Sequence, residues 1–271
     1  MKKVFIYLLS ICFISISCED VIDLDLPNQD PQLVIEASIN WQKGTLGNNQ
    51  EIKLSLTAPF FEENIPPATG ASVRISNASN ELFIFTETEP GIYRNDSFNP
   101  ELNMTYELEI IYDNETYRGS ETLKEVSSID FVEQDNGGGF LGEDFEIKAY
   151  YTDPANEENY YLYRFSNTTQ QELELEVYND EFTNGNQIFA YYSSEEITVG
   201  DQIEITAIGV SRQFHDYFFL LRQQTDDENG DPFEVQPAVL RGNCTNSTNP
   251  DHFPLGYFRL SQTDQTSYIV E

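Results

Sequence analysis

The stretch Leu33-Val34-Ile35-Glu36-Ala37-Ser38-Ile39 places an apolar residue at every second position. Because successive side chains of a β-strand point to opposite faces, this period of two predicts a strand with one buried face. The stretch Ile52-Lys53-Leu54-Ser55-Leu56 repeats the pattern. Further strand-like segments, separated by turn residues, follow at 71–75, 82–85, 91–93, 106–112 and 116–118. Short strands at this spacing predict an immunoglobulin-like β-sandwich over 32–125.

The remainder of the chain predicts a larger antiparallel β domain over 140–271, with one short α-helix near 211–224. Phe214 and Leu221 recur at helical spacing, and Ser211 can cap the first turn. Strand-like segments lie at 144–151, 160–165, 172–178, 188–192, 201–208 and 256–260. The glycine-rich segment 124–142 between the two parts predicts a flexible loop at a boundary. The predicted fold class is therefore mainly β.

The N-terminal segment has the pattern of an export signal. Met1-Lys2-Lys3 is basic, and the apolar region that follows it is shorter than the roughly 20 residues of a membrane-spanning helix. A small residue, Ser17, precedes Cys18, which predicts a lipoprotein signal over 1–17 and acylation, such as palmitate, at Cys18. The alternative is an ordinary secretory signal with an incidental cysteine. Residues 18–31 then predict an acidic, extended tether leading into the first strand.

The charge balance limits the possible partners. The chain of 271 residues carries 14 Lys and Arg against 47 Asp and Glu, which gives a formal net charge of −33. Nucleic-acid binding depends on clustered Lys and Arg, so the composition argues against a nucleic-acid partner. The same negative field attracts cations and basic protein surfaces.

The cysteines and histidines predict no catalytic centre. Cys12 leaves with the signal and Cys18 carries the lipid, so Cys244 remains without an intramolecular disulfide partner. No base or positive charge flanks Cys244, so an inert role is expected. His215 and His252 belong to no zinc motif and are expected to be structural. We therefore predict no catalytic residue and no cofactor.

Loops carry most binding residues on β scaffolds, so two loops are the candidate ligand surface. The first is the acidic loop 226–231, and the second is 253–257. The oxygen ligands of the first loop also suit calcium, although the spacing with a terminal bidentate Glu is missing, and a solvated loop is the alternative. The candidate ligand-binding residues are Asp226, Asp227, Asn229, Asp231 and Tyr257, and the candidate calcium ligands among them are Asp226, Asp227 and Asp231.

Tyrosines occur in adjacent pairs along several predicted strands, as in Tyr150-Tyr151 and Tyr191-Tyr192. Because side chains alternate along a strand, one ring of each pair is expected in the core and the other on the surface. Surface rings combine apolar area with a hydrogen-bonding tip, which suits contact with sugars or with a protein partner.

Several segments together resemble a family of Bacteroidetes outer-membrane lipoproteins of undefined function, commonly encoded beside TonB-dependent receptors. These segments are 18–24, 33–37, 89–93, 178–182, 185–186 and 255–259. The pair Glu19-Asp20 also resembles the surface-export signal of such lipoproteins. The resemblance implies a lipid-anchored, surface-exposed outer-membrane protein that assists a TonB-dependent receptor in nutrient capture or uptake. It supplies no catalytic residues.

The leading functional hypothesis is a non-enzymatic accessory or binding lipoprotein. One alternative is a surface glycan hydrolase, which requires two carboxylates at catalytic separation and a raised pKa at one of them. A second alternative is a structural or adhesion module, which requires a broad patch of exposed aromatic residues.

Overall fold

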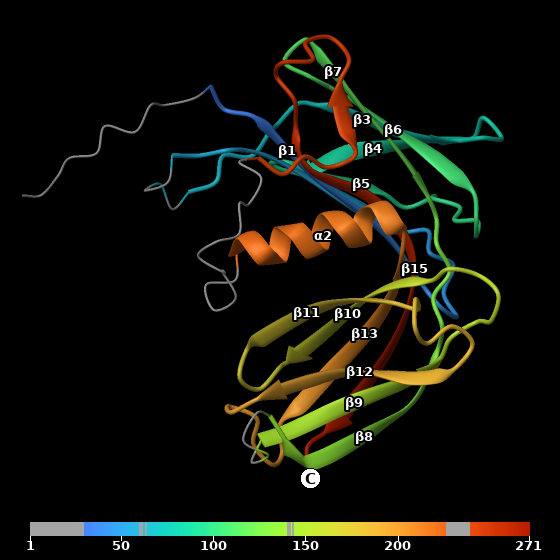
Figure 1. Cartoon of the computed structure of the whole chain (residues 1–271). Coiled ribbons are helices and arrows are strands. Elements are labelled where there is room, and N and C mark those ends of the chain that lie inside the picture. The colour runs from blue at the N-terminus through green and yellow to red at the C-terminus, as the bar shows by residue number, and fades with distance from the viewer. Residues whose placement is uncertain (1–29, 60–61, 63, 140–141, 143, 226–238) are drawn as a thin grey trace, which may run out of the picture. The chain divides into compact units, whose positions relative to one another are not determined.

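The structure is a computed structural model that describes residues 30–271 apart from 60–61, 63, 140–141, 143 and 226–238 (Figure 1). The predicted signal, Cys18 and nearly all of the tether lie outside the described residues. Residues 31–271 form one compact unit. None of its described helices is long and apolar enough to cross a membrane.

The described residues form strands and one helix. The strands of the first half are β1 (Leu33–Gln42), β2 (Gln50–Leu56), β3 (Ser72–Asn77), β4 (Leu82–Glu89), β5 (Ile92–Asn95), β6 (Thr105–Tyr112) and β7 (Glu115–Thr122). The second half contains β8 (Ile129–Gly138), β9 (Asp144–Thr152), β10 (Tyr160–Asn167), β11 (Glu172–Asn179), β12 (Gln187–Ser194), β13 (Gln202–Val210), α2 (Arg212–Thr225), β14 (Cys244–Asn246) and β15 (Leu255–Ile269).

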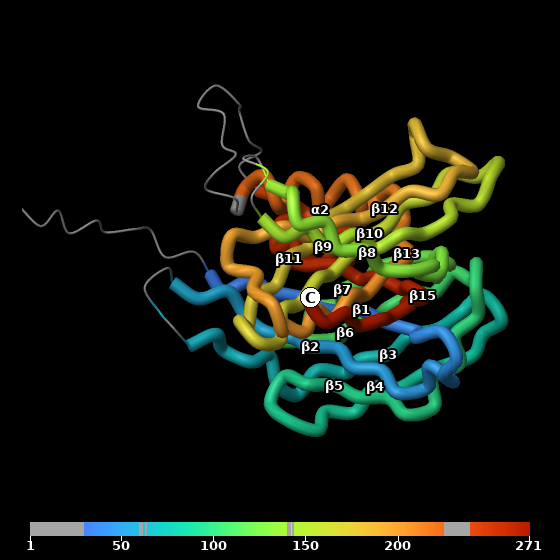
Figure 2. The backbone as a smooth tube through the Cα atoms, turned by 90° about the horizontal axis from the view of Figure 1, so that it is seen from below, coloured from blue at the N-terminus to red at the C-terminus, as the bar shows by residue number. Residues whose placement is uncertain are grey.

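Most of these strands belong to one twelve-stranded sheet with the order β11-β10-β13-β15-β1-β2-β5-β4-β3-β6-β7-β14. The long strand β15 joins its two halves. Residues 255–263 of β15 pair in parallel with β1, and residues 263–269 pair antiparallel with β13. Figure 2 shows β15 between the first and second halves of the chain. The strands β12, β9 and β8 form a separate antiparallel sheet.

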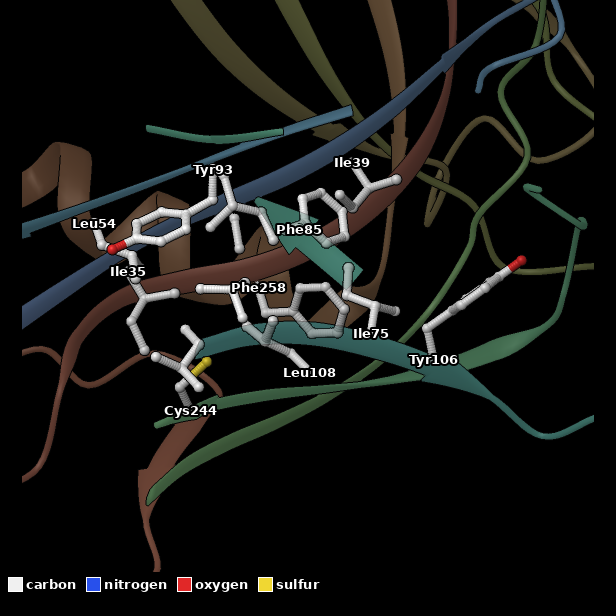
Figure 3. Packing of buried hydrophobic residues seen from close by; sticks show 14 of the residues in the cluster. Ile35, Ile39, Leu54, Ile75, Phe85, Tyr93, Tyr106, Leu108, Cys244 and Phe258 are labelled. Atoms are coloured by element: carbon white, nitrogen blue, oxygen red, sulfur yellow. The ribbon is translucent and has the colours of Figure 1, made fainter. Parts of the chain in front are cut away.

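The first half is a two-layered β-sandwich. The strand β4 belongs to both layers, because its first part pairs with β3 and its last part pairs with β5. Side chains from β1, β2 and β5 pack against those from β3, β6 and β7, and Phe258 of β15 and Cys244 of β14 complete this first core (Figure 3). Ile35 of β1 is fully buried, whereas its neighbour Glu36 is exposed, as the period of two requires.

The second half contains two further cores. One face of the β8-β9-β12 sheet packs on β10 and β13, where Tyr151, Tyr161 and Tyr163 are almost completely buried. Helix α2 packs through Phe214 against residues of β10, β13 and β15, which form the other core. The Phe214 ring meets the ring of Tyr257 edge-on, with the ring centroids 5.1 Å apart. Figure 1 shows α2 lying between the strands of the two halves.

The predicted fold class is confirmed: the described chain is mainly β, with a sandwich first and one short helix in the second half. Ser211 caps α2, because its Oγ accepts the N–H of Phe214 at 3.2 Å. The two predicted parts have separate cores, because Leu123 belongs to the first core and Val126 belongs to the second. The strands β14 and β15 come late in the sequence but also contribute to the first part.

The predicted flexible loop over 124–142 is wrong, because strand β8 occupies 129–138. Its sequence, IDFVEQDNGG, has a bulge between Ile129 and Phe131 that interrupts the period of two. Glycine-rich residues at its end added to the loop-like pattern. Pairing with β9 overrides this weak local preference.

Candidate functional site

A cleft of about 530 Å³ lies where the two halves meet. Its lining comes mainly from the connection that follows β7, the residues that lead into and begin β10, and the residues that lead into and begin α2, with Lys43 and Asn103 added from the first half. Ligand sites in proteins commonly have this size and this kind of position between structural halves. The cleft is therefore the leading candidate for a binding site.

Positive side chains are concentrated in this cleft. Lys43, Lys124 and Arg212 line it, although the whole chain has only 14 Lys and Arg. The carboxylates that line the same cleft are those of Glu125, Glu157 and Glu158. Charges of both signs near one another suit a polar ligand that carries hydrogen-bond donors and acceptors.

The connection that carries Lys124 is held firmly against the sheet. The N–H of Lys124 donates to the Leu260 carbonyl at 3.3 Å, and the Lys124 carbonyl accepts the N–H of Gln262 at 2.7 Å. On the other side, a Cβ atom at Gly209 of β13 would lie 1.9 Å from the carbonyl oxygen of Glu125. Only glycine permits this approach, so β13 and β15 together fix the position of one cleft wall.

Several hydrogen-bonding groups belong to the lining of the cleft or to its immediate neighbours. The Oδ1 atom of Asn159, a residue of the lining, is buried and has no hydrogen-bond partner among the described residues. The backbone N–H of Asn159 is held by the carboxylate of Asp180 at 3.0 Å. The Lys43 ammonium donates to Ser128 Oγ at 2.9 Å. A buried oxygen without a partner costs free energy, so this atom is a local cost of the fold beside the cleft.

A second hollow, of about 480 Å³, adjoins this cleft and shares Glu158, Tyr160 and Arg212 with it. Its remaining wall includes His215 on α2, whose Nδ1 lies 3.1 Å from the Asp216 carboxylate. This contact agrees with the structural role expected for His215 from the sequence. Together the two hollows form one polar groove along the start of α2, which we call the α2 groove.

A partly buried cluster of polar side chains contacts the start of the helix. Glu121 accepts hydrogen bonds from Ser211 Oγ at 2.8 Å and from the Tyr257 hydroxyl at 3.3 Å. Arg259 is buried and donates to Ser261 and Asn40. Burial lowers the pKa of Arg259 to about 10, and the charge of Glu121 opposes that shift. Glu121 of β7 therefore links the start of α2 to β15.

Of the candidate ligand-binding residues predicted from the sequence, the structure describes Tyr257 alone. Tyr257 lies in β15 rather than in a loop, and it is buried beneath α2 with 6% of its surface exposed. The other candidate ligand and calcium residues, Asp226, Asp227, Asn229 and Asp231, lie outside the described residues, as does Cys18. Among the residues that the structure does describe, no group of three or more His, Cys, Asp or Glu is arranged to hold a metal ion.

The remaining cysteine and histidine have structural surroundings. Cys244 is 6% exposed, and burial raises the pKa of its thiol to about 12. It is therefore protonated and unreactive near neutral pH. His252 binds the Glu115 carboxylate through Nδ1 at 2.7 Å, and this pair ties the segment after β14 to β7.

Sequence reasoning did not find the α2 groove. Its cations come from separate segments and form no motif with fixed spacing. The available signal was their rarity: in a chain so acidic, each Lys or Arg is a candidate for a specific role. Their proximity depends on the pairing of β15 with both β1 and β13, which strand patterns alone do not reveal.

Comparison with solved structures gives only distant likenesses. A DUF4785 family protein from Legionella pneumophila matches at 12% identity and TM-score 0.22, covering 65% of this chain and 52% of that one. A two-domain fibronectin type-III segment of chicken tenascin matches at 9% identity and TM-score 0.22, covering 67% of this chain and 91% of that one. The chicken interferon gamma receptor alpha chain matches at 10% identity and TM-score 0.21, covering 67% of this chain and 89% of that one. TM-scores this low establish no shared fold.

The chain spans about half the length of the Legionella protein that it matches. No curated protein matches the sequence. A family model described as a domain of unknown function, DUF4249, matches residues 19–267. This match extends over nearly all of the described residues and includes both halves and the strand β15 that joins them. The chain therefore belongs to the DUF4249 family.

Proposed function

We propose that this protein is a lipid-anchored, non-enzymatic binding protein of the outer membrane that assists a TonB-dependent receptor in capturing or taking up a nutrient. The observation that carries the binding role is the α2 groove. It collects cations from a cation-poor chain, and its walls are fixed by backbone contacts rather than by side chains alone. A groove with fixed walls binds with a smaller cost of ordering.

The membrane role rests on the N-terminal sequence and on the resemblance to outer-membrane lipoproteins. Lipid attached at Cys18 would tether the compact unit that begins at Pro31. The acidic segment 18–31 would then act as a spacer between the membrane and the folded part. Release of a Cys18→Ser variant from the membrane fraction is expected, and retention of that variant with an uncleaved N-terminus would contradict the anchor.

The groove suits a polar solute with both hydrogen-bond donors and acceptors, such as a short peptide or an oligosaccharide. The Lys124 ammonium would donate a hydrogen bond to an anionic or carbonyl group of the ligand. Charge-assisted hydrogen bonds of this kind contribute about 1.5–3 kcal/mol each.

Calorimetric titration of the full-length protein with panels of tetrapeptides and oligosaccharides tests this role. Any ligand found should bind at least about tenfold more weakly to a Lys124→Glu variant, which corresponds to about 1.4 kcal/mol. Lys53→Glu is the matched control, because Lys53 lies on β2 and pairs with Glu36 at 2.8 Å, away from the groove. Equal loss of affinity in both variants would remove the groove from the proposal.

The same titrations distinguish binding from catalysis. An accessory protein returns its ligand unchanged after prolonged incubation, as chromatography of the ligand would show. Cleavage of a peptide or a glycan that depends on Lys124 or on a groove carboxylate would overturn the non-enzymatic role.

A further inference from the structure

The outer face of the β8-β9-β12 sheet carries three aromatic rings in register. Phe131 of β8 lies opposite Tyr150 of β9, and Tyr150 lies opposite Phe189 of β12. The first pair stacks with ring centroids 4.5 Å apart, and the second pair is tilted at 5.2 Å. We call these three side chains the aromatic row. Figure 1 shows the sheet that carries it at the end of the molecule away from β3 and β7.

The aromatic row is additional to the core. The inner face of the same sheet is already packed, with Ala149 and Ala190 fully buried. On the outer face, 48% of Phe131 and 39% of Phe189 are exposed, and 48% of the neighbouring Tyr191 is exposed. Grouped aromatic rings on a surface are unusual and mark interaction sites, because water contact with so much apolar area is unfavourable.

The surroundings of the aromatic row are acidic. Asp130, Glu133, Asp135 and Glu146 belong to the same strands, and the carboxylate of Asp130 accepts hydrogen bonds across the outer face from Thr152 and Gln187. Lys148 is already neutralised, because its ammonium contacts Asp135 at 2.8 Å and Glu146 at 2.9 Å. An apolar centre with an acidic rim is complementary to a partner that combines apolar side chains with Lys or Arg.

Ring contacts within the aromatic row favour a protein partner over a sugar. A sugar stacks on the open face of an aromatic ring, but Phe131 and Tyr150 lie nearly parallel, 15° apart, and stack on each other. The Lys148 ammonium lies over the ring of Phe189 at 5.3 Å. These contacts leave less open ring face for a sugar, and the acidic rim favours a basic protein partner.

We propose that the outer face of the β8-β9-β12 sheet is a docking surface for a basic protein surface. Apolar side chains of the partner pack on the aromatic row, and its Lys and Arg side chains meet the carboxylates at the rim. The surface lies on strands that do not line the α2 groove, so protein docking and solute binding use different residues.

Site-specific photo-crosslinking in native cells tests this docking surface. A photoreactive amino acid replaces Tyr191 in the full-length lipoprotein, and the control position is Ile84 of β4, which is 63% exposed on the other half. The expected result is a discrete protein adduct from position 191 and none from position 84. Sequencing of the crosslinked peptide should find Lys or Arg beside apolar residues.

Charge reversal provides the second measurement. With the crosslinker at position 191, Glu133→Lys should lower the adduct yield about tenfold, because it places a like charge opposite the basic partner. Glu107→Lys on β6 is the matched control and should leave the yield unchanged. Equal yields from positions 191 and 84, an adduct that contains glycan, no adduct at all, or no effect of Glu133→Lys would each overturn the proposal.

Discussion

Replacing Gly209 by alanine tests how the fold positions the α2 groove. Gly209 lies on β13, opposite Tyr161 of β10, and its Cα faces the backbone of the connection that lines the groove. An added Cβ would lie 1.9 Å from the carbonyl oxygen of Glu125 and 2.6 Å from its carbonyl carbon. Both contacts are with backbone atoms, so no side-chain rotation relieves them.

The cost follows from the distance. Real Cβ atoms essentially never approach another atom within 3.0 Å, so one of the two backbones must move by about 1 Å. Overpacking of this kind costs about 1–3 kcal/mol. We expect the upper end, about 3 kcal/mol, because the connection is also bonded to β15 at Lys124. For a folded unit of this size, that loss lowers Tm by about 6–12 °C.

Thermal and urea unfolding measure this loss. The single tryptophan, Trp41, packs against the first core, so its fluorescence reports the first half, and near-ultraviolet circular dichroism reports the tyrosine-rich second half. Gly137→Ala is the control, since the nearest atom to its added Cβ is 3.5 Å away. Its stability should stay within about 1 kcal/mol of the parent protein. A Gly209→Ala protein as stable as this control would refute the close approach of the connection to β13.

Three further predictions concern stability and reactivity. Asp201 is buried, and hydrogen bonds from the Thr198 N–H and then from Asn167 lower its pKa. The ionised carboxylate therefore stabilises the folded state above the ordinary Asp pKa of about 4, and this stabilisation is lost as the pH falls through the lower folded pKa. In Asp201→Asn, the free energy of unfolding measured in urea should fall less steeply over that acidic range. Cys244 should react with a thiol reagent at least about a hundredfold faster in urea than in the native state, because burial raises its pKa to about 12; rapid native reaction would contradict that burial. Both spectroscopic signals should unfold together, because β15 pairs with strands of both halves; two separated transitions would show that the halves unfold independently.

Local patterns predicted most of the strands. Leu33 to Ile39 and Ile52 to Leu56 alternate so regularly that only one face can be buried, and both are strands in the structure. The helix was also predictable, because Ser211 supplies a cap and the aromatic residues follow at helical spacing. Such features depend on near neighbours in the sequence, which is the information that a pattern contains.

Long-range pairing was not predictable in the same way. The segment 255–269 pairs with β1, which begins more than two hundred residues earlier, and with β13, which begins more than fifty residues earlier. Nothing in the composition of the segment specifies these two strands as its partners. Its first residues are buried on both sides, so the alternation that marks other strands is missing between Tyr257 and Thr263. Strand β8 lacks a clear alternation for a different reason, because most of its residues are exposed or half-buried.

The binding surfaces illustrate the same distinction. The paired tyrosines predicted one buried and one outward ring, and Tyr151 and Tyr192 are buried while Tyr150 and Tyr191 face outward. Their alignment with Phe131 depends on β8, a strand that the sequence pattern did not reveal. The α2 groove likewise requires the tertiary pairing of β15.

Co-purification from native membranes tests the proposal that the protein is a membrane-tethered partner of a TonB-dependent receptor. The tagged full-length lipoprotein is solubilised from native membranes in mild detergent, and the material that co-purifies is quantified by mass spectrometry, with the Cys18→Ser variant as the control for membrane attachment. We expect a TonB-dependent β-barrel receptor in near-stoichiometric amount with the lipidated protein. A lipidated protein that purifies without any such receptor would contradict the proposal.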